Sequence, residues 1–588
     1  MTIQPDDARQ ASLGYTAILR RYLGPQWRRV TLLALLLVAG IGLQLAIPQI
    51  LRAFIDAATS RAAIGQISQL GVVFLGIAVA GQLIAIGEVY VAESLGQATV
   101  NELRADLLRH CLGLDLGFHY RRTPGELIER VDGDVANLAN FFSRFAVQIV
   151  GNAILLIGIL ALLFGVSRTI GAAISAVTLV AVVVLIRLRD AGVPRMTAAR
   201  QASAELFGFL EERLVGTEDL RASGAVAHTL RRLAERSEKV FRAERFAAFV
   251  SAATGFSANL FLALITVVGL ALSGLAFYRR EISIGSVYLV FSYTQILSRP
   301  LEQMSRQIQD LQRAMASLNR ILQLFSTRSQ LNPGGRLRFP GGPLSVELEN
   351  VTFGYSPDEL VLRGLCLSLR PGEVLGLLGR TGSGKTTIAR LIARFYDPLD
   401  GEIRVGGIDL GNASTKEIRK RIGIVTQEIH LFHATVRDNL TLFDPIISDE
   451  QIVAVLKDLG LWTWCQSLPG GLNARLSPDG GGLSAGEAQL LAFARVFLRA
   501  PGLVILDEAS SRLDPATERQ IEHALDRLLI GRTAIVIAHR LTTVERAETI
   551  AILEGGEIRE FGARLDLARD PSSRFARLRR VGLEEVLV

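Results

Sequence analysis

Cysteine is scarce in this chain of 588 residues. Its three cysteines, Cys111, Cys366 and Cys465, lie far apart and show neither CxxC nor Cys/His spacing. The sequence therefore predicts neither a disulfide framework nor a zinc site. We expect each cysteine to act as a small buried hydrophobic side chain.

Charge is scarce as well. Charged residues make up 21% of the chain, against 49% hydrophobic residues, and the mean hydropathy of +0.33 is high for a soluble globular protein. We therefore expect the chain to enter a membrane. Lys and Arg number 64 and Asp and Glu 57; cytoplasmic flanks of membrane spans explain this small excess, so no nucleic-acid partner is implied. The length indicates two or more domains.

Six apolar runs lie in the first half of the chain. At about 20 residues each, they are long enough to cross the roughly 30 Å hydrocarbon core. They are residues 30–51, 70–91, 146–166, 169–186, 256–277 and 282–297. The sixth is short unless its helix continues through Arg299 and Pro300. The first run is longer than the core of a signal peptide, so we expect it to remain as a span.

The connections between the runs predict the orientation. Those at 93–144 and 187–245 are long, rich in Arg and helical in pattern. The positive-inside rule places them in the cytoplasm, together with both termini. We predict a multi-pass protein of the cell (plasma or inner) membrane.

Four segments follow from these patterns. Residues 1–29 form a cytoplasmic N-terminal segment, whose end is either an amphipathic elbow helix at the membrane interface or a basic flank of the first span. Residues 30–325 form the six-span domain with long cytoplasmic helical extensions. Residues 326–343, rich in Pro and Gly, are a linker, and residues 344–588 form a soluble domain.

A phosphate-binding motif lies early in the soluble domain. The strand-like run 374–378 leads into Gly379-Arg380-Thr381-Gly382-Ser383-Gly384-Lys385-Thr386, and a helical segment follows. This is the complete GxxxxGK[ST] pattern, in which glycines let backbone N–H groups surround the phosphates. Lys385 supplies charge to the β- and γ-phosphates, and Thr386 is a ligand for Mg²⁺. We therefore predict ATP and Mg²⁺ as cofactors.

An acidic pair follows a second apolar strand. The run 503–506 ends in Asp507 and Glu508, and carboxylates at the C-terminal end of such a strand lie near the phosphates and the metal. We expect Asp507 to hold Mg²⁺ and Glu508 to orient or deprotonate the attacking water. The alternative, a helix cap, loses most of its weight behind a phosphate-binding loop.

Between these motifs, Leu483-Ser484-Ala485-Gly486-Glu487 opens an apolar helix. With this segment the chain resembles the ATP-binding cassette (ABC) family, whose consensus here is LSGGQ, and six spans before one cassette resemble an exporter-type half-transporter. The resemblance implies an all-α transmembrane six-helix domain followed by an α/β P-loop NTPase domain of ABC type. It also implies ATP hydrolysis coupled to transport, and a dimer in which two cassettes enclose two ATP molecules.

The resemblance assigns roles to further residues. Tyr355 is similar to the aromatic that stacks on adenine, and Gln427 to the lid glutamine that senses Mg²⁺ and the membrane domain. Asp514 lies in the segment that crosses to the opposite subunit, and His539 corresponds to the histidine that contacts the γ-phosphate. The implied catalytic residues are Glu508, His539, Lys385 and Gln427, and the implied metal ligands are Thr386, Gln427 and Asp507. The ATP-binding set is Tyr355, Gly379, Arg380, Thr381, Gly382, Ser383, Gly384, Lys385, Thr386, Thr387, Gln427 and His539.

The signature segment Ser484, Ala485, Gly486 and Glu487, which acts on the partner's ATP, departs from the consensus. Ser484 and Glu487 form an S-x-x-E capping box, so one interpretation is simply a well-started helix. In the other, Glu487 adds negative charge and Ala485 adds a Cβ where a γ-phosphate should approach. An intact catalytic half beside an altered signature resembles the family's asymmetric heterodimers, which we favour slightly over a homodimer.

Two cytoplasmic segments resemble the coupling segments of exporters: the pair 118–120 and 123–127, and 214–220. Polar residues within spans are candidates for lining a transport pathway; they are Gln44, Gln82, Glu88, Gln148, Asn152 and Gln295. Glu88 either lies near an interface or pairs with an arginine, or it contacts the substrate. Such low charge suits a hydrophobic or amphipathic cargo: a drug, lipid or lipopeptide. An importer of a complexed metal or vitamin and an ATP-gated channel remain the alternatives.

Overall fold

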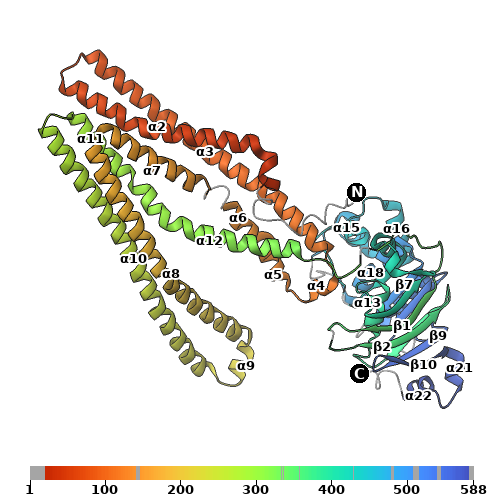
Figure 1. Cartoon of the computed structure of the whole chain (residues 1–588). Coiled ribbons are helices and arrows are strands. Elements are labelled where there is room, and N and C mark those ends of the chain that lie inside the picture. Colours follow the sequence, from red (N-terminus) through yellow and green to blue (C-terminus); the bar gives the residue numbers. More distant parts are fainter. Residues whose placement is uncertain are drawn as a thin grey trace. The chain divides into compact units, whose positions relative to one another are not determined.

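A computed structural model of the chain gives the fold (Figure 1). It describes residues 20–140, 146–332, 334–335, 337–356, 358–427, 429–477, 483–507, 515–538 and 544–581. The chain divides into two compact units. The first holds Met1–Leu112 and Pro124–Thr327, and the second holds Gly113–Thr123 and Arg328–Val588.

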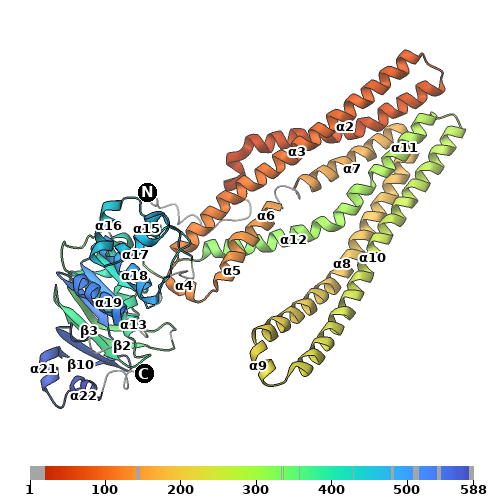
Figure 2. The ribbon, with the colours of Figure 1, turned by 180° about the vertical axis from the view of Figure 1, so that it is seen from behind.

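The first unit is helical throughout its described residues. Its long helices α8 and α10 run side by side and are joined at one tip by the short helix α9 (Figure 1 and Figure 2). The helices in chain order are α2 (Trp27–Thr59), α3 (Ile64–Gly113), α5 (Pro124–Ile128), α6 (Val135–Asn140), α7 (Ala146–Val166), α8 (Arg168–Val215), α9 (Thr217–Ala222), α10 (Val226–Tyr278), α11 (Ile284–Ile296) and α12 (Ser298–Ser326). A 3₁₀ turn (Gly24–Gln26) precedes α2, and a π-helical turn (Glu129–Asp134) joins α5 to α6.

Five helices among the described residues are long and apolar enough to cross a membrane: the ones that contain α2, α3, α7, α8 and α10. The sixth predicted span corresponds to α11, which has only 13 residues. At 1.5 Å per residue it is about 20 Å long, short of the hydrocarbon thickness. Leu297 has a helical backbone (φ −63°, ψ −18°), and the chain continues directly as α12 through Arg299 and Pro300, so the sixth apolar run leads into a second helix with an irregularity of one residue.

The helical core of this unit lies where α7, α8, α10 and α11 meet, and Ile265 is the buried residue that α10 contributes. Ile159 and Leu163 of α7, Ile174 of α8 and Tyr293 of α11 are fully buried there. The apolar side chains Val72, Leu75, Val79 and Leu83 of α3 are instead exposed. A membrane span is expected to show this pattern, because lipid covers the outer apolar face.

Polar contacts join α2 to α11 at two levels. The Tyr293 hydroxyl accepts a hydrogen bond from Gln49 Nε2 at 2.9 Å and donates to the Leu45 carbonyl at 3.0 Å. Asp56 accepts from the Ser283 hydroxyl at 2.7 Å and from the Gly285 N–H at 2.9 Å. A Cβ on Gly285 would lie 2.5 Å from the Arg52 carbonyl, so only glycine permits this close approach.

The second unit contains two sheets. A four-stranded antiparallel sheet has the order β2-β1-β4-β5, and a six-stranded sheet has the order β10-β9-β3-β8-β7-β6. All neighbours in the larger sheet are parallel except β10, which is antiparallel to β9. The strands are β1 (Val346–Phe353), β2 (Leu362–Leu369), β3 (Val374–Gly379), β4 (Asp400–Val405), β5 (Ile408–Asp409), β6 (Ile422–Val425), β7 (Leu503–Asp507), β8 (Thr533–Ile537), β9 (Thr549–Glu554) and β10 (Glu557–Ala563).

Side chains of β3 enter two cores in alternation. Leu375 and Leu377 pack with the antiparallel sheet, whereas Val374 and Leu378 pack with the helical side. The helices of this unit are α4 (Leu116–Tyr120), α13 (Lys385–Ile392), α14 (Thr415–Arg421), α15 (Val436–Thr441), α16 (Asp449–Asp458), α17 (Trp462–Ser467), α18 (Ala485–Arg499), α19 (Pro515–Leu529), α21 (Arg564–Arg569) and α22 (Arg574–Val581).

The cysteines are all free, and two of them follow the prediction. Cys111 and Cys465 are buried, but Cys366 is exposed, so the expectation of three buried cysteines is wrong there. Cys366 lies on the outward face of β2, whose burial alternates along the strand. Its thiol donates to Asn350 Oδ1 at 3.3 Å.

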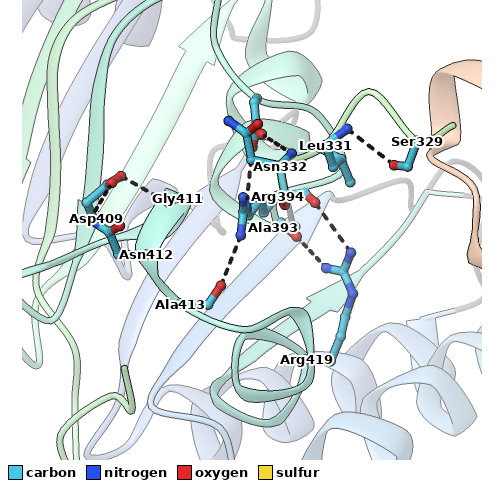
Figure 3. A network of polar contacts seen from close by, with 11 residues as sticks. Ser329, Leu331, Asn332, Ala393, Arg394, Asp409, Gly411, Asn412, Ala413 and Arg419 are labelled. Atoms are coloured by element: carbon cyan, nitrogen blue, oxygen red, sulfur yellow. Dashed lines mark hydrogen bonds and ion pairs between the residues drawn. The ribbon is translucent and has the colours of Figure 1, made fainter. Parts of the chain in front are cut away.

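An arginine fixes part of the predicted linker to the second unit (Figure 3). Arg394 is only 3% exposed and donates to Asp397 at 3.0 Å, to the Ala413 carbonyl at 3.0 Å and to the Asn332 carbonyl at 3.1 Å. Asp397 in turn accepts from the Asn332 N–H at 3.1 Å. A Cβ on Gly335 would lie 2.0 Å from the Asn412 carbonyl, so this part of the linker packs tightly rather than serving only as a spacer.

Candidate nucleotide-binding site

The phosphate-binding loop has the predicted strand–loop–helix geometry. It leaves β3 at Gly379, and α13 begins at Lys385. Gly382 and Gly384 have φ of 81° and 108°, a left-handed backbone that favours glycine. The Ser383 hydroxyl is buried without a hydrogen-bond partner among the described residues. An unsatisfied buried donor on this loop fits a site built to receive a phosphate oxygen.

Lys385 is held inside the loop. It is 6% exposed, and its Nζ donates to the carbonyls of Gly379 at 2.6 Å and Arg380 at 3.0 Å. Burial lowers the pKa of Lys385 below its usual value, although the negative charge of Asp507 opposes this effect. The cation therefore lies folded against the loop backbone, where the negative charge of a phosphate would stabilise its protonated form.

Thr386 and Asp507 lie together as the sequence predicts. The Thr386 hydroxyl donates to Asp507 Oδ2 at 3.0 Å, and Asp507 ends β7. The carboxyl ends of parallel strands lie at one edge of a sheet, which brings this pair to the phosphate-binding loop. A hydroxyl and a carboxylate are hard oxygen ligands, so the two residues fit Mg²⁺.

Gln427 and Tyr355 are both accessible. Gln427 is exposed, two residues beyond the end of β6, which pairs in parallel with β7. Tyr355 is 47% exposed; its ring packs edge-on against Phe353 and Tyr396 at centroid distances of 5.1 and 5.3 Å. Its hydroxyl lies 3.2 Å from the Thr387 hydroxyl, so Tyr355 and Thr387 adjoin the loop.

Several predicted site residues lie outside the described residues. They are Glu508, Asp514 and His539. The side chain of Ala485 is also outside the described set, although its backbone begins α18. The proposed roles of these four residues remain predictions from the sequence.

The signature helix begins with the capping box that its sequence predicts. The Ser484 hydroxyl accepts from the Glu487 N–H at 3.2 Å, and Glu487 Oε2 accepts from the Ser484 N–H at 2.7 Å. The Ser484 hydroxyl also lies 2.9 Å from the same Oε2 and donates to it. Gly486 is buried. At this helix start, the N–H and the hydroxyl of Ser484 therefore both donate to the Glu487 carboxylate.

The two parts of the first coupling segment lie in different units: residues 124–127 lie in α5 of the first unit, and residues 118–120 lie in α4 of the second. Asp115 caps α4 by accepting from the Phe118 N–H at 2.9 Å, and it also accepts from the Gln330 N–H at 2.7 Å. Burial disfavours the charge of Asp115, but hydrogen bonds from these N–H groups and from its own backbone, together with the positive charge of Arg121, hold its pKa below the usual value. The second coupling segment corresponds to α9, which has no buried residue.

The sequence alone did not single out Arg390. Its guanidinium donates to the hydroxyls of Tyr355 and Tyr120, both at 3.1 Å. With Tyr396 these residues line a cavity of about 580 Å³. Arg390 follows Thr387 by one helical turn, and this i, i+3 spacing is the signal that could have placed it beside Tyr355.

Together, the phosphate-binding loop, the Thr386–Asp507 pair and the capped signature helix define a P-loop ATPase domain that follows a helical membrane domain. The ABC transporter family model matches residues 362–511, and the ABC transporter transmembrane region model matches residues 30–301. The chain belongs to the ABC transporter family. It has the architecture of an exporter-type half-transporter, a multi-pass protein of the cell membrane that couples ATP hydrolysis to transport.

Relatives of similar length support this assignment. An uncharacterized ABC transporter ATP-binding protein YfiC of Bacillus subtilis is 30% identical over 481 residues, which are 81% of this chain and 79% of that protein. A fatty acid ABC transporter ATP-binding/permease protein of Mycobacterium bovis is 31% identical over 475 residues, 80% and 74% of the two chains. The solved structure of a bacterial Atm1-family ABC exporter with ATP bound has the same fold, with a TM-score of 0.78, 24% identity, and coverage of 96% of this chain and 98% of that chain.

Proposed function

We propose that this chain exports a hydrophobic or amphipathic compound, such as a drug, a lipid or a lipopeptide, as one half of a dimer. The observation that carries the proposal is the Thr386–Asp507 pair beside Lys385, in a chain whose other half consists of apolar helices. The relative whose printed name gives fatty acids as cargo supports a lipid-like substrate.

In this proposal the chain's own residues bind and orient ATP. The loop backbone and Lys385 hold the β- and γ-phosphates, and Tyr355 stacks on adenine. Thr386 and Asp507, with Gln427, would hold Mg²⁺, which neutralises charge on the phosphates when bound. Glu508 orients the attacking water and His539 contacts the γ-phosphate.

We also propose that the dimer is an asymmetric heterodimer. The hydrogen bonds between Ser484 and Glu487 support this proposal. The N–H and the hydroxyl of Ser484 both donate to the Glu487 carboxylate, so they are not available to donate to a γ-phosphate bound by the partner. A homodimer is the alternative, and robust ATPase activity of this chain purified alone would favour it.

Transport into proteoliposomes tests the direction of transport and distinguishes a transporter from a channel. With the ATP-binding domain facing outward, an exporter accumulates a fluorescent amphipathic compound inside the vesicle only when ATP is added outside. ATP-dependent release of a preloaded compound would instead indicate an importer, and electrical current that persists down a gradient would indicate an ATP-gated channel. Lys385→Ala, which removes the phosphate-binding cation, is the control that should abolish ATP-dependent accumulation.

A further inference from the structure

Five of the six polar residues predicted within the spans line one cavity. Gln44 of α2, Gln82 and Glu88 of α3, and Gln148 and Asn152 of α7 surround a space of about 410 Å³. The sixth, Gln295, donates instead to the Thr266 hydroxyl at 3.3 Å and does not line this space. Polar groups from three helices, far apart in sequence, therefore converge on one side of the membrane domain.

Glycines make room for this cavity. Gly40, Gly81 and Gly151 lie in its wall, so three wall positions carry no side chain. A Cβ on Gly40 would lie 3.7 Å from Glu88 Oε2, which shows that the carboxylate lies close to the α2 backbone. A volume of this size is within the range of small-molecule sites.

The polar residues of the lining differ in their exposure. Gln82 and Gln148 are exposed, whereas Gln44, Glu88 and Asn152 are partly buried. Apolar side chains, including Leu37, Ile41 and Leu155, complete the wall. An amphipathic ligand is matched by such a lining, because its apolar part contacts the aliphatic side chains and its polar part contacts the amides.

Glu88 gives the cavity its charge. In the part of the chain that the structure describes, no Arg, Lys or His side chain forms an ion pair with it. A carboxylate at membrane depth is costly unless a positive charge or hydrogen-bond donors compensate it. Neighbouring amide N–H groups offer donors, but no neighbouring group among the described cavity residues offers a positive charge.

We propose that this cavity is a substrate subsite for an amphipathic organic cation, with Glu88 facing the positive charge. This inference rests on the proposed export of amphipathic compounds and narrows their chemistry. The amide carbonyls of Gln44 and Gln148 provide further acceptors for an ammonium group, and the aliphatic wall contacts its apolar part. An anionic compound of the same size is disfavoured by the carboxylate.

Binding of two hydrophobic ions of similar size and opposite charge tests the proposal. The full-length transporter, assembled as its dimer in lipid nanodiscs without ATP, is titrated with tetraphenylphosphonium and, separately, with tetraphenylborate, and protein-free nanodiscs give the background. Glu88→Gln is expected to weaken binding of the cation about tenfold, or about 1.4 kcal/mol, and to leave or improve binding of the anion.

A charge-matched control lies on the same helix. Glu93→Gln removes a carboxylate that accepts from Gln97 at 3.1 Å and does not line the cavity, so it should leave both affinities unchanged. Unchanged cation affinity in Glu88→Gln, or an equal loss in Glu93→Gln, would overturn the proposal. If Glu88→Gln fails to fold, Gln82→Glu adds a carboxylate at an exposed position of the lining, and unchanged cation affinity in that variant would overturn the proposal as well.

The assay separates this inference from the proposed function. Because binding is measured without ATP, loss of ATP-driven export does not affect its outcome. Suppose that the transporter exports neutral amphipathic compounds but binds the cation with the same affinity in the wild type and in Glu88→Gln. The proposed subsite is then wrong, and the proposed export function still stands.

Discussion

The Thr386 hydroxyl and the Asp507 carboxylate are 3.0 Å apart although 121 positions separate them in the sequence. Thr386 lies in the first turn of the helix after β3 and Asp507 ends β7. Strand β8 lies between these two strands in the sheet. The parallel sheet therefore brings to the same edge, next to Lys385, the hydroxyl and the carboxylate that we propose as Mg²⁺ ligands. In the proposed function, the ATPase chemistry depends on this arrangement.

Asp507→Asn removes the negative charge at this site while leaving an oxygen that can still accept from Thr386. We expect Mg²⁺-dependent hydrolysis to fall at least about 100-fold with little change in folding, because the carboxylate contributes charge rather than shape. Steady-state ATPase activity across Mg²⁺ concentrations measures this. Asp458→Asn, which alters a surface pair with Arg527, is the matched control, and equal losses in both variants would contradict the assignment.

Glu487→Gln should strengthen the interaction of this chain's signature segment with the ATP bound by the partner. The amide can retain the capping box, because Gln451 forms the same box with Ser448 at the start of α16. Removal of the carboxylate charge near an approaching γ-phosphate is expected to lower the ATP concentration for half-maximal turnover about fivefold. Turnover against ATP concentration in the assembled dimer measures this effect.

Gln451→Glu places the reverse change at a helix start that has no predicted role in ATP binding. It should leave the ATP dependence unchanged. If Glu487→Gln also leaves it unchanged, the capping box is only a structural device, and the case for an asymmetric dimer weakens.

Much of the nucleotide site could be predicted from the sequence because its signals are local. The glycine spacing, the apolar strand before Asp507 and the Ser484–Glu487 spacing each lie within a few residues, and the structure has the predicted elements at all three. Contacts between distant segments gave no such signal. Nothing local indicates that Arg394 binds the linker at Asn332, or that Arg390 reaches Tyr120.

In the membrane domain, too, the sequence predicts local features but not contacts between distant segments. Five of the six predicted apolar runs lie in long apolar helices, since length and hydropathy are properties of the run itself. The sequence left open whether the sixth helix continues through Arg299 and Pro300; the structure continues it as α12 after a single helical residue, Leu297. The convergence of five polar residues on one cavity depends on helix rotation and packing, which the runs do not specify.

Arg394→Ala should destabilise the ATP-binding domain. It removes a buried guanidinium and leaves Asp397 and two carbonyls without its hydrogen bonds, which we expect to cost about 3 kcal/mol. Thermal unfolding of the full-length protein, followed with and without ATP, measures the loss. Arg404→Ala breaks an exposed pair with Glu402 and should leave the unfolding temperature nearly unchanged; equal shifts in both would contradict the role given to Arg394.

Asp115 should make the contact between α4 and the backbone at Gln330 sensitive to acid. Its pKa is lower in the folded protein than in an unfolded chain, so its stabilising effect is complete above about pH 4 and is lost as the pH falls through the folded value. Asp115→Asn is expected to cost about 1–3 kcal/mol at neutral pH. The difference in stability between the wild type and this variant should shrink below about pH 4, and a difference that stays constant down to pH 2.5 would contradict the assignment.

The most direct test of the account is whether ATP draws two ATP-binding domains together. Spin labels are placed on the exposed Cys366 and on the partner half. The distance between them is measured in nanodiscs with a Glu508→Gln variant, which we expect to bind ATP without steady-state hydrolysis. The account predicts a shift to a shorter distance when ATP and Mg²⁺ are added, and no shift when Lys385→Ala is also present. An unchanged distance in Glu508→Gln with ATP bound would contradict it.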